Sequence, residues 1–398
     1  MDSKKLIASA VSSLALVVSA CGGGDSGAAS DEIVIGVAQP LSGPVASAGQ
    51  AVADGARIAA DEINKDGGVN GRRIELVIED DANDPATCVN VAQRFITRVQ
   101  AHAVMGGWGS SCTLAMEPVL ARAEMPLLVE TSSSNKVTTE AEAGNPWTFR
   151  ISPTSSMEAT ALTPVLEEMD IKRAFTLSVN NDFGLGAARH YGEVLTGIGA
   201  EMVGGVKFDQ NEQSFSTYIT KAIAANADTW VVTTDAGQLA LLMKEAAGQG
   251  AEARIITTGG SNSPVQVQEL AGAEAVEGTY ATMFYPSFDT SLAADAQAAE
   301  RFNSAWVEAG HDPGEMTEGV RGYAGIHVLA AAFENVDDPS DSDQVRQALS
   351  DVKMPAAVYG EISFQNWNGL INQNVPPVYL VQTVNKKLKL IGAGNPPY

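Results

Sequence analysis

The chain has 398 residues and a formal net charge of -23 at pH 7, with 48 acidic against 25 basic side chains. Such an acidic surface repels phosphate backbones, so nucleic acid is not an expected partner. The length exceeds what one hydrophobic core usually supports and predicts two domains. The three cysteines and four scattered histidines show no metal-ligand spacing. We therefore expect neither a metal nor another cofactor.

The first 21 residues combine a basic start, an apolar run and small residues before a cysteine. This layout is typical of an export signal with a cleavage site. It resembles the bacterial lipoprotein signal, which implies that residues 1–20 are removed and that Cys21 carries a lipid. The glycine-rich segment 21–31 then predicts a flexible tether. We expect an exported monomer, lipid-anchored at the cell membrane and facing the periplasm or the extracellular side; the alternative is a short buried helix in a cytoplasmic protein.

The segment that follows alternates short β-branched runs with helical patterns. Its predicted elements are, in chain order, a strand at 33–38, a helix at 50–65, a strand at 74–79, a helix at 85–99, a strand at 103–106, a helix at 113–123, and strands at 127–130 and 147–151. Parallel strands joined by crossover helices form a doubly wound α/β sheet.

The same alternation starts again after residue 151. The predicted elements are a helix at 157–169, a strand at 174–179, a helix at 186–197, a strand at 202–208, a helix at 215–225, a strand at 229–234, a helix at 238–248, a strand at 254–258, a helical stretch at 292–333, and strands at 358–364 and 378–384. Two blocks of similar length predict two doubly wound, Rossmann-like lobes. The late strands indicate that the chain crosses back between them. We assign 32–151 and 281–356 to lobe one, 152–280 and 357–385 to lobe two, and 386–398 to a C-terminal tail.

Several short motifs occur in the order and at the spacing of a known family. They lie at 55–64 with 67–71, at 80–85, at 109–113 and at 181–186. Together they resemble the type 1 periplasmic binding proteins of the leucine/isoleucine/valine kind. The resemblance implies two lobes joined by three crossings, which close on a small solute and present it to the permease of a membrane ABC transporter.

Two loops of lobe one are rich in hydroxyl groups and follow neighbouring strands. Ligands of open α/β sheets bind beyond the carboxyl ends of the strands, where helix N-termini attract anions. The candidate ligand-binding residues in these loops are Trp108, Ser110, Ser111, Ser132, Ser133 and Ser134. The alternative is that these serines only cap helices and fill turns. The resemblance implies that Ser110, Ser132 and Ser134 hold the ligand's carboxylate or α-amino group.

Four further candidates lie later in the chain. The resemblance places Phe183 over the ligand, although an ordinary core aromatic is equally compatible. Gly259 stands where the family typically has a carboxylate that pairs with the ligand's ammonium group. Asp235, just past the strand at 229–234, is then the remaining acidic candidate, and its alternative role is helix capping. We expect Tyr285 to make the pocket more aromatic.

The combined reading is an extracytoplasmic solute-binding lipoprotein whose ligand is an amino acid or a related small carboxylate. Alternatives are a ligand-sensing receptor subunit of the same fold, or a binder of an amine-free acid, amide or urea-like solute. No catalytic motif pairs a nucleophile with a base, so we do not expect an enzyme. Cys88 and Cys112 form a disulfide candidate in an exported protein, and the alternative is two buried thiols.

Overall fold

A computed structural model describes residues 32–139, 145–259 and 263–397 of the chain. The expected signal peptide at 1–20, the lipid-bearing Cys21 and the tether at 21–31 lie outside the described residues. In the part of the chain that the structure describes, no helix combines the length and apolar content needed to cross a bilayer.

The first lobe is built on a seven-stranded sheet in the order β13-β14-β5-β4-β3-β1-β2. Its strands are β1 (Glu32–Gln39), β2 (Arg73–Asp80), β3 (Ala103–Gly106), β4 (Leu127–Val129), β5 (Thr148–Arg150), β13 (Gln365–Trp367) and β14 (Leu370–Gln373). The helices that cover it are α1 (Ala46–Lys65), α2 (Pro85–Arg94), α3 (Ser110–Arg122), α11 (Ala296–Glu308), α12 (Met316–Phe333) and α13 (Ser342–Ser350). Strands β1 to β5 are parallel, as the alternating pattern predicts.

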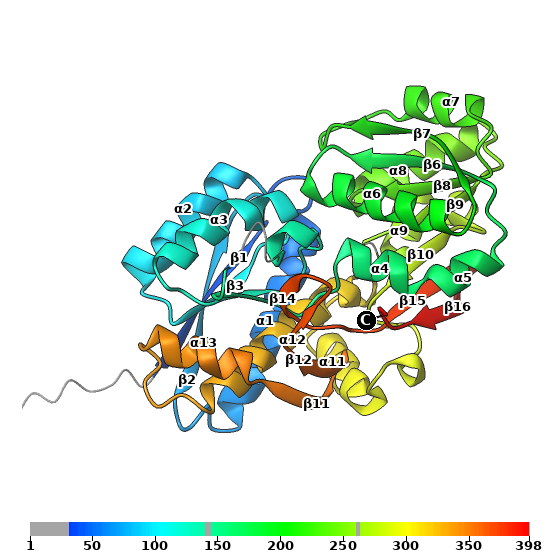
Figure 1. The fold of residues 1–398 in the computed structure, drawn as a ribbon. Coiled ribbons are helices and arrows are strands. Elements are labelled where there is room, and N and C mark those ends of the chain that lie inside the picture. The colour runs from blue at the N-terminus through cyan, green and yellow to red at the C-terminus, as the bar shows by residue number, and fades with distance from the viewer. Residues whose placement is uncertain (1–31, 140–144, 260–262, 398) are drawn as a thin grey trace, which may run out of the picture.

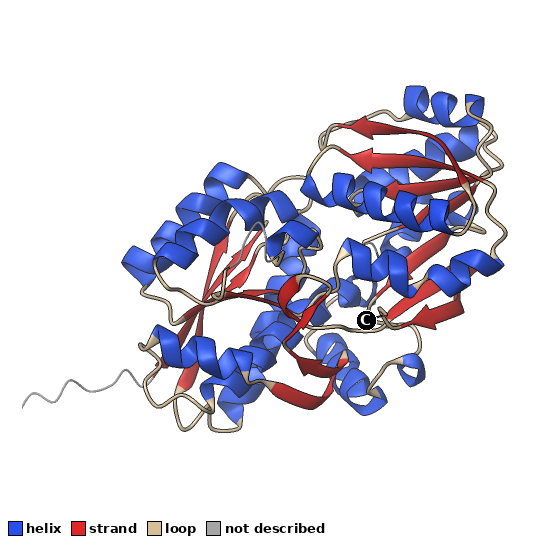
Figure 2. Cartoon of the chain, viewed as in Figure 1, coloured by secondary structure: helices blue, strands red, loops and turns tan. Residues whose placement is uncertain are grey.

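The second lobe has a matching sheet in the order β16-β15-β10-β9-β8-β6-β7. Its strands are β6 (Arg173–Val179), β7 (Glu201–Phe208), β8 (Thr229–Thr233), β9 (Arg254–Thr257), β10 (Tyr280–Met283), β15 (Val378–Val384) and β16 (Lys387–Gly394). Its helices are α4 (Ser155–Ala161), α5 (Thr163–Glu168), α6 (Asp182–Gly197), α7 (Ser216–Ala224), α8 (Ala236–Gly248), α9 (Pro264–Ala271) and α10 (Ala273–Val276). In both lobes helices flank the strands (Figure 2).

The chain passes between the two lobes three times (Figure 1). The crossings lie between β5 and α4, between β10 and α11, and between β14 and β15. A separate two-stranded sheet, β11 (Lys353–Ala357) with β12 (Gly360–Ser363), follows α13. The expectation of two doubly wound lobes with three crossings is therefore confirmed.

The strands near the boundaries differ from the expected assignment. β10 belongs to the second sheet although 281–356 was expected in lobe one, and the hairpin β13–β14 pairs with β5 although 357–385 was expected in lobe two. The expected tail at 386–398 contains β16, which pairs antiparallel with β15. The hairpin and the last strand each had a sequence signal. Asn368 and Gly369 form the positive-φ turn of a hairpin, and Lys and Leu alternate along β16.

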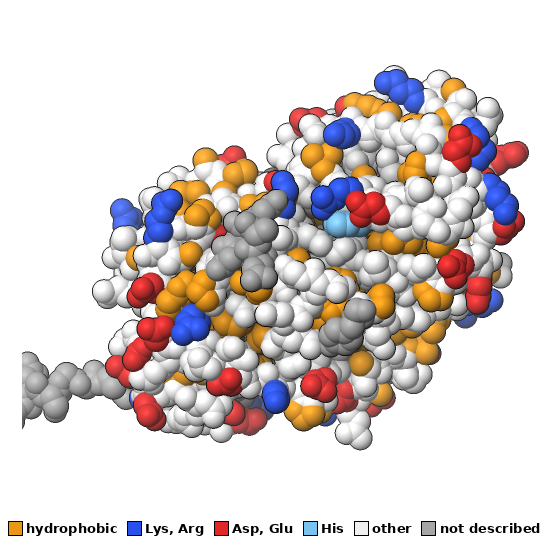
Figure 3. Space-filling view, in the orientation of Figure 1, with side chains coloured by type: hydrophobic (Ala, Val, Ile, Leu, Met, Phe, Trp, Pro, Cys, Tyr) orange, Lys and Arg blue, Asp and Glu red, His pale blue; other side chains and the backbone are white. Residues whose placement is uncertain are grey.

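The expected helix at 157–169 is divided into α4 and α5 at Leu162, because Pro164 has no N–H to continue the first helix. The core of lobe one depends on a close approach of two helices. A Cβ atom on Gly55 of α1 would lie 1.8 Å from the carbonyl oxygen of Gly319 in α12, so only glycine permits this contact. On the face shown in Figure 3, acidic and basic side chains are interspersed.

Candidate functional site

Residues of both lobes line a cavity of about 290 Å³ at the carboxyl ends of the parallel strands, which we call the large chamber. Its lining consists of Asn83, Pro85, Trp108, Gly109, Ser110, Ser111, Thr131, Ser133, Asn180, Asn181, Phe183, Asp209, Gln210 and Thr234. A smaller cavity of about 50 Å³, the small chamber, adjoins it. Its lining consists of Pro44, Val45, Ala82, Asn83, Trp108, Val179, Asn181, Phe183, Gln210, Asn211 and Asp235. A ligand in these chambers contacts both lobes.

The N-terminus of α3 provides the hydrogen-bond donors of the large chamber. Gly109 precedes the helix and has no side chain to cap it, and the first turn carries no acidic residue. The first-turn N–H groups and the positive end of the helix dipole therefore favour an anion beside Ser110. The loop after β4 adds Thr131 and Ser133 to the same lining. Four of the residues expected from lobe one, Trp108, Ser110, Ser111 and Ser133, thus lie in one chamber.

Ser132 and Ser134 lie outside both linings and support Ser110 instead. The Ser132 hydroxyl donates to Oγ of Ser110 at 3.1 Å, and the Ser134 N–H donates to the same oxygen at 3.2 Å. All three side chains are buried. These two contacts fix the Ser110 side chain, so Ser132 and Ser134 position Ser110 without lining the chamber themselves.

Lobe two contributes three loops. Asn181 caps α6 by accepting the Gly184 N–H at 3.0 Å, and this turn brings Asn180 and Phe183 into the large chamber. Asp209 and Gln210 follow β7, and Thr234 follows β8. In the described lining of the two chambers the charged side chains are Asp209 and Asp235, and neither lining includes Lys or Arg.

Asp235 lines the small chamber and also caps α8. Its Oδ1 accepts the Gln238 N–H at 3.0 Å, and burial raises the pKa of the carboxyl group. Its position is therefore compatible with both roles considered from the sequence, ligand binding and helix capping.

Gly259 lies behind the chamber wall and not in it. Its φ of +98° is in the left-handed region, and a Cβ atom there would lie 2.5 Å from Cζ of Phe183. Its N–H donates to both carboxylate oxygens of the buried Glu158 at 3.0 Å. The ring of Phe183 thus occupies the space that a side chain at position 259 would need.

Tyr285 does not reach either chamber. The side chain is buried in the core of lobe one, where its ring packs edge-on against Phe302 and its hydroxyl bonds to the carbonyl oxygen of Ala299 at 3.1 Å. The expectation that Tyr285 adds aromatic surface to the pocket is therefore not supported by the structure. It lies two residues beyond β10, and the chain there already runs toward α11.

Two contacts link the lobes beside the large chamber. The Ser111 hydroxyl donates to Oδ2 of Asp182 at 2.8 Å, and the Lys136 ammonium group lies 3.0 Å from Oδ1 of the same carboxylate. Ser111 and Lys136 belong to lobe one, whereas Asp182 begins α6 of lobe two. Because these contacts bring Ser111 against α6, the lobes meet at the edge of the chamber.

A buried acid sets the orientation of Trp108. The indole N–H donates to Oε2 of Glu318 at 3.0 Å, and Nε of Arg321 lies 3.5 Å from the same oxygen. Burial raises the pKa of Glu318. Sequence reasoning missed Glu318, because a Glu inside a helix has no pattern that shows what it faces. Sequence reasoning also missed three asparagines of the lining, Asn83, Asn180 and Asn181. Each of them follows the carboxyl end of a predicted strand, where ligands of such sheets bind.

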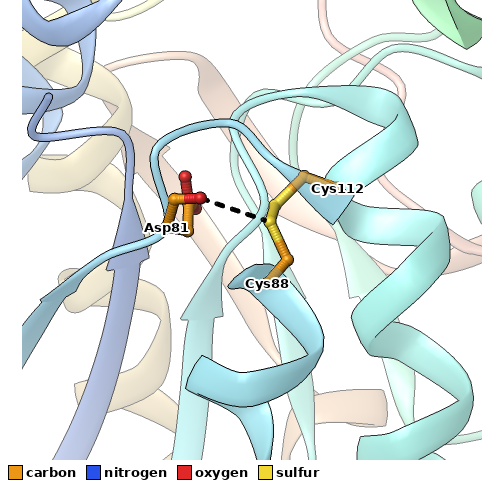
Figure 4. Close-up of side chains that lie close together, drawn as sticks. All are labelled: Asp81, Cys88 and Cys112. Carbon is orange, nitrogen blue, oxygen red and sulfur yellow. Dashed lines mark hydrogen bonds between the residues drawn. A yellow bond between two sulfur atoms is a disulfide. The ribbon is translucent and has the colours of Figure 1, made fainter. Parts of the chain in front are cut away.

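Cys88 in α2 and Cys112 in α3 form a disulfide in the structure, with Cα atoms 5.6 Å apart, inside the usual range for a bridge. Asp81 lies beside them, and its backbone oxygen is 3.9 Å from Sγ of Cys88 (Figure 4). The sulfur atoms and the Asp81 carboxylate lie close enough together to suit a metal ion, but a disulfide has no thiolate to offer as a ligand.

The comparisons with known proteins agree with this architecture. The family model described as "Periplasmic binding protein" matches residues 32–387. The chain is 30% identical over 345 residues to an "Amino acid binding protein" of Pseudomonas aeruginosa, covering 85% of this chain and 87% of that protein. It is 27% identical to the Leu/Ile/Val-binding protein BraC3 of Rhizobium johnstonii, covering 86% and 90% respectively.

Solved structures share the fold. The leucine-binding protein LivK of Thermotoga maritima superposes with a TM-score of 0.80 at 22% identity, covering 92% of this chain and 99% of that one. A solute-binding protein of R. palustris in complex with 4-hydroxybenzoate superposes with a TM-score of 0.79 at 20% identity, covering 92% and 98%. The match to the family model over nearly all the described residues shows that the chain belongs to the periplasmic binding protein family.

Proposed function

We propose that this protein captures a small carboxylate between its lobes and delivers it to an ABC transporter. The observation that carries the proposal is the N-terminus of α3, which has no side-chain cap and whose first residues, Ser110 and Ser111, line a chamber shared by both lobes. The described lining has no cationic side chain, so an anion there is held by N–H and hydroxyl groups. The curated relatives named as amino acid binders and the solved complex with 4-hydroxybenzoate support the same ligand class.

The two lobes act as separate bodies in this proposal. Each has its own sheet and its own hydrophobic core, and three crossings join them. Such an arrangement favours hinge closure around a ligand. An exported form anchored through Cys21 is consistent with capture outside the cytoplasm and hand-over to a membrane permease.

The ligand class is tested by identifying what the protein carries and then titrating it. Mass spectrometry of the solute released by denaturing freshly purified protein supplies the first candidate. Calorimetric titration with leucine, benzoate and 4-hydroxybenzoate then measures affinity. We expect a carboxylate to bind and to raise the melting temperature, because it binds the native state only.

Substitution of Ser110 tests where the ligand's carboxylate binds. Ser110→Ala removes a hydroxyl beside the anion position and should weaken carboxylate binding by about 1.5–3 kcal/mol, the range for a hydrogen bond to a charged group. Tyr285→Phe is the matched control, because its hydroxyl lies in the lobe-one core. Equal affinity in Ser110→Ala and the wild type, or no carboxylate bound at all, would contradict the proposal.

A further inference from the structure

The two chambers differ in what they offer a ligand. Hydrogen-bond donors of the α3 N-terminus line the large chamber but not the small one. The small chamber is walled mainly by apolar and amide side chains, and Asp235 is the one charged group in its described lining. A ligand that fills both chambers therefore meets the N-terminus of α3 in the large chamber and the Asp235 carboxylate in the small one.

The Asp235 carboxylate can accept a hydrogen bond from a ligand. Its Oδ1 accepts the Gln238 N–H, but a carboxylate has two oxygens and about four acceptor positions. Burial removes water from this carboxyl group and thereby raises its pKa. A ligand group that donates a hydrogen bond replaces the lost water and stabilises the ionised carboxylate. Among the described residues that line the small chamber there is no Lys or Arg to neutralise it.

The passage between the chambers is aromatic. The residues that line both are Asn83, Trp108, Asn181, Phe183 and Gln210. Trp108 is held by its bond to Glu318, and Phe183 lies over Gly259, where no side chain competes for the space. Two positioned aromatic side chains favour a planar apolar group in the middle of the ligand.

We propose that the ligand is an elongated aromatic carboxylate whose carboxylate binds at the N-terminus of α3, whose ring lies between Trp108 and Phe183, and whose far end donates a hydrogen bond to Asp235. This inference rests on the proposed function and narrows its ligand class. An α-amino acid carries its ammonium group beside the carboxylate, in the large chamber. There Asp209 is the acid in the described lining, and Asp235 is not part of that lining.

Benzoate and 4-hydroxybenzoate test the far end, because they differ only in the donor opposite the carboxylate. We expect wild-type protein to bind 4-hydroxybenzoate at least about tenfold more tightly than benzoate, as a donor facing a charged acceptor would produce. Asp235→Asn should reduce this preference to less than about threefold, because the acceptor loses its charge. The variant keeps the α8 cap, since asparagine caps helices as well as aspartate.

Asp341→Asn is the matched control, because Asp341 also caps a helix, accepting the Gln344 N–H at 3.2 Å, and lines neither chamber. The ratio of the two affinities should not change in it. A wild-type protein that binds both benzoates equally, or a preference that survives in Asp235→Asn, would overturn the inference. Leucine binding that is tighter than both and is lost in Asp209→Asn would overturn it too. Since benzoate binding alone supports the proposed function, and binding of no carboxylate refutes it, the two failures are distinguishable.

Discussion

Asp81 should make the stability of this protein fall as the pH rises from about 4 to about 6. The side chain is buried, its Oδ1 accepts the Asn83 N–H at 2.8 Å, and its Oδ2 has no hydrogen-bond partner among the described residues. Burial raises the pKa of this carboxyl group from the ordinary value near 3.8 to about 6. The folded state therefore holds a proton that the unfolded state releases between these two pH values.

The magnitude follows from the two pKa values. A rise from 3.8 to about 6 corresponds to about 3 kcal/mol at 1.36 kcal/mol per pKa unit, and above pH 6 this whole amount opposes folding. Asp81→Asn removes the ionisation but keeps an oxygen for the Asn83 N–H. Its buried amide adds a cost of about 1–3 kcal/mol that does not depend on pH. Part of this difference is already present at pH 4, where the unfolded carboxyl group is more than half ionised. The stability of the variant minus that of the wild type should thus increase by about 2.4 kcal/mol between pH 4 and pH 7.

Urea unfolding followed by tryptophan fluorescence at several pH values and constant ionic strength measures this difference. Burial also raises the pKa of other acids, among them Glu117, Glu130, Glu158, Asp235 and Glu318, but these groups titrate in both proteins and cancel. Asp84→Asn is the control with the opposite sign. The Thr87 N–H and hydroxyl lower the pKa of Asp84, so its contribution is present at neutral pH and is lost in acid. Parallel pH curves for Asp81→Asn and the wild type would refute the reasoning.

Three further outcomes are expected. Replacing Cys88 and Cys112 by serine should destabilise the protein by about 3 kcal/mol in thermal or urea unfolding, since the bridge closes a loop with a sequence separation of 24; two titratable thiols in the denatured, unreduced wild type would contradict this. Asp182→Asn should weaken the contact with Lys136 and widen the average lobe separation in X-ray scattering, by an effect worth less than about 1 kcal/mol; superimposable curves would count against it. The intact mass of membrane-extracted protein should show a lipid on Cys21 as the first residue, and an unprocessed chain would exclude it.

The alternating pattern predicted nearly all the strands of the two βαβ blocks, because buried parallel strands have strong local signals. The late strands were assigned incorrectly for a physical reason. β14 pairs with β5, whose residues lie more than 200 positions earlier, and β15 pairs with β10. Nothing in a strand's own residues shows which distant edge it will join, so the hairpin β13–β14 and the strand β16 were assigned to the wrong parts.

The candidate site was predicted best where position along a strand decides it. Ser110, Ser111 and Asp235 directly follow strands or begin helices at the ligand edge, and the structure places them in the chambers. Tyr285 and Gly259 show the limit of the method. Sequence reveals that a residue follows a strand, but not whether its side chain turns toward the cleft or the core, which depends on packing partners elsewhere in the chain.

The segment from β13 to β16 completes both sheets, since its first hairpin joins β5 and its last two strands join β10. While a ribosome is still making the chain, each sheet therefore lacks two of its seven strands and ends in an open edge. We expect such partial sheets to be incompletely folded, because the missing contacts are long-range and form late. Neither lobe can therefore complete its sheet before the residues of β13 to β16 have been synthesised.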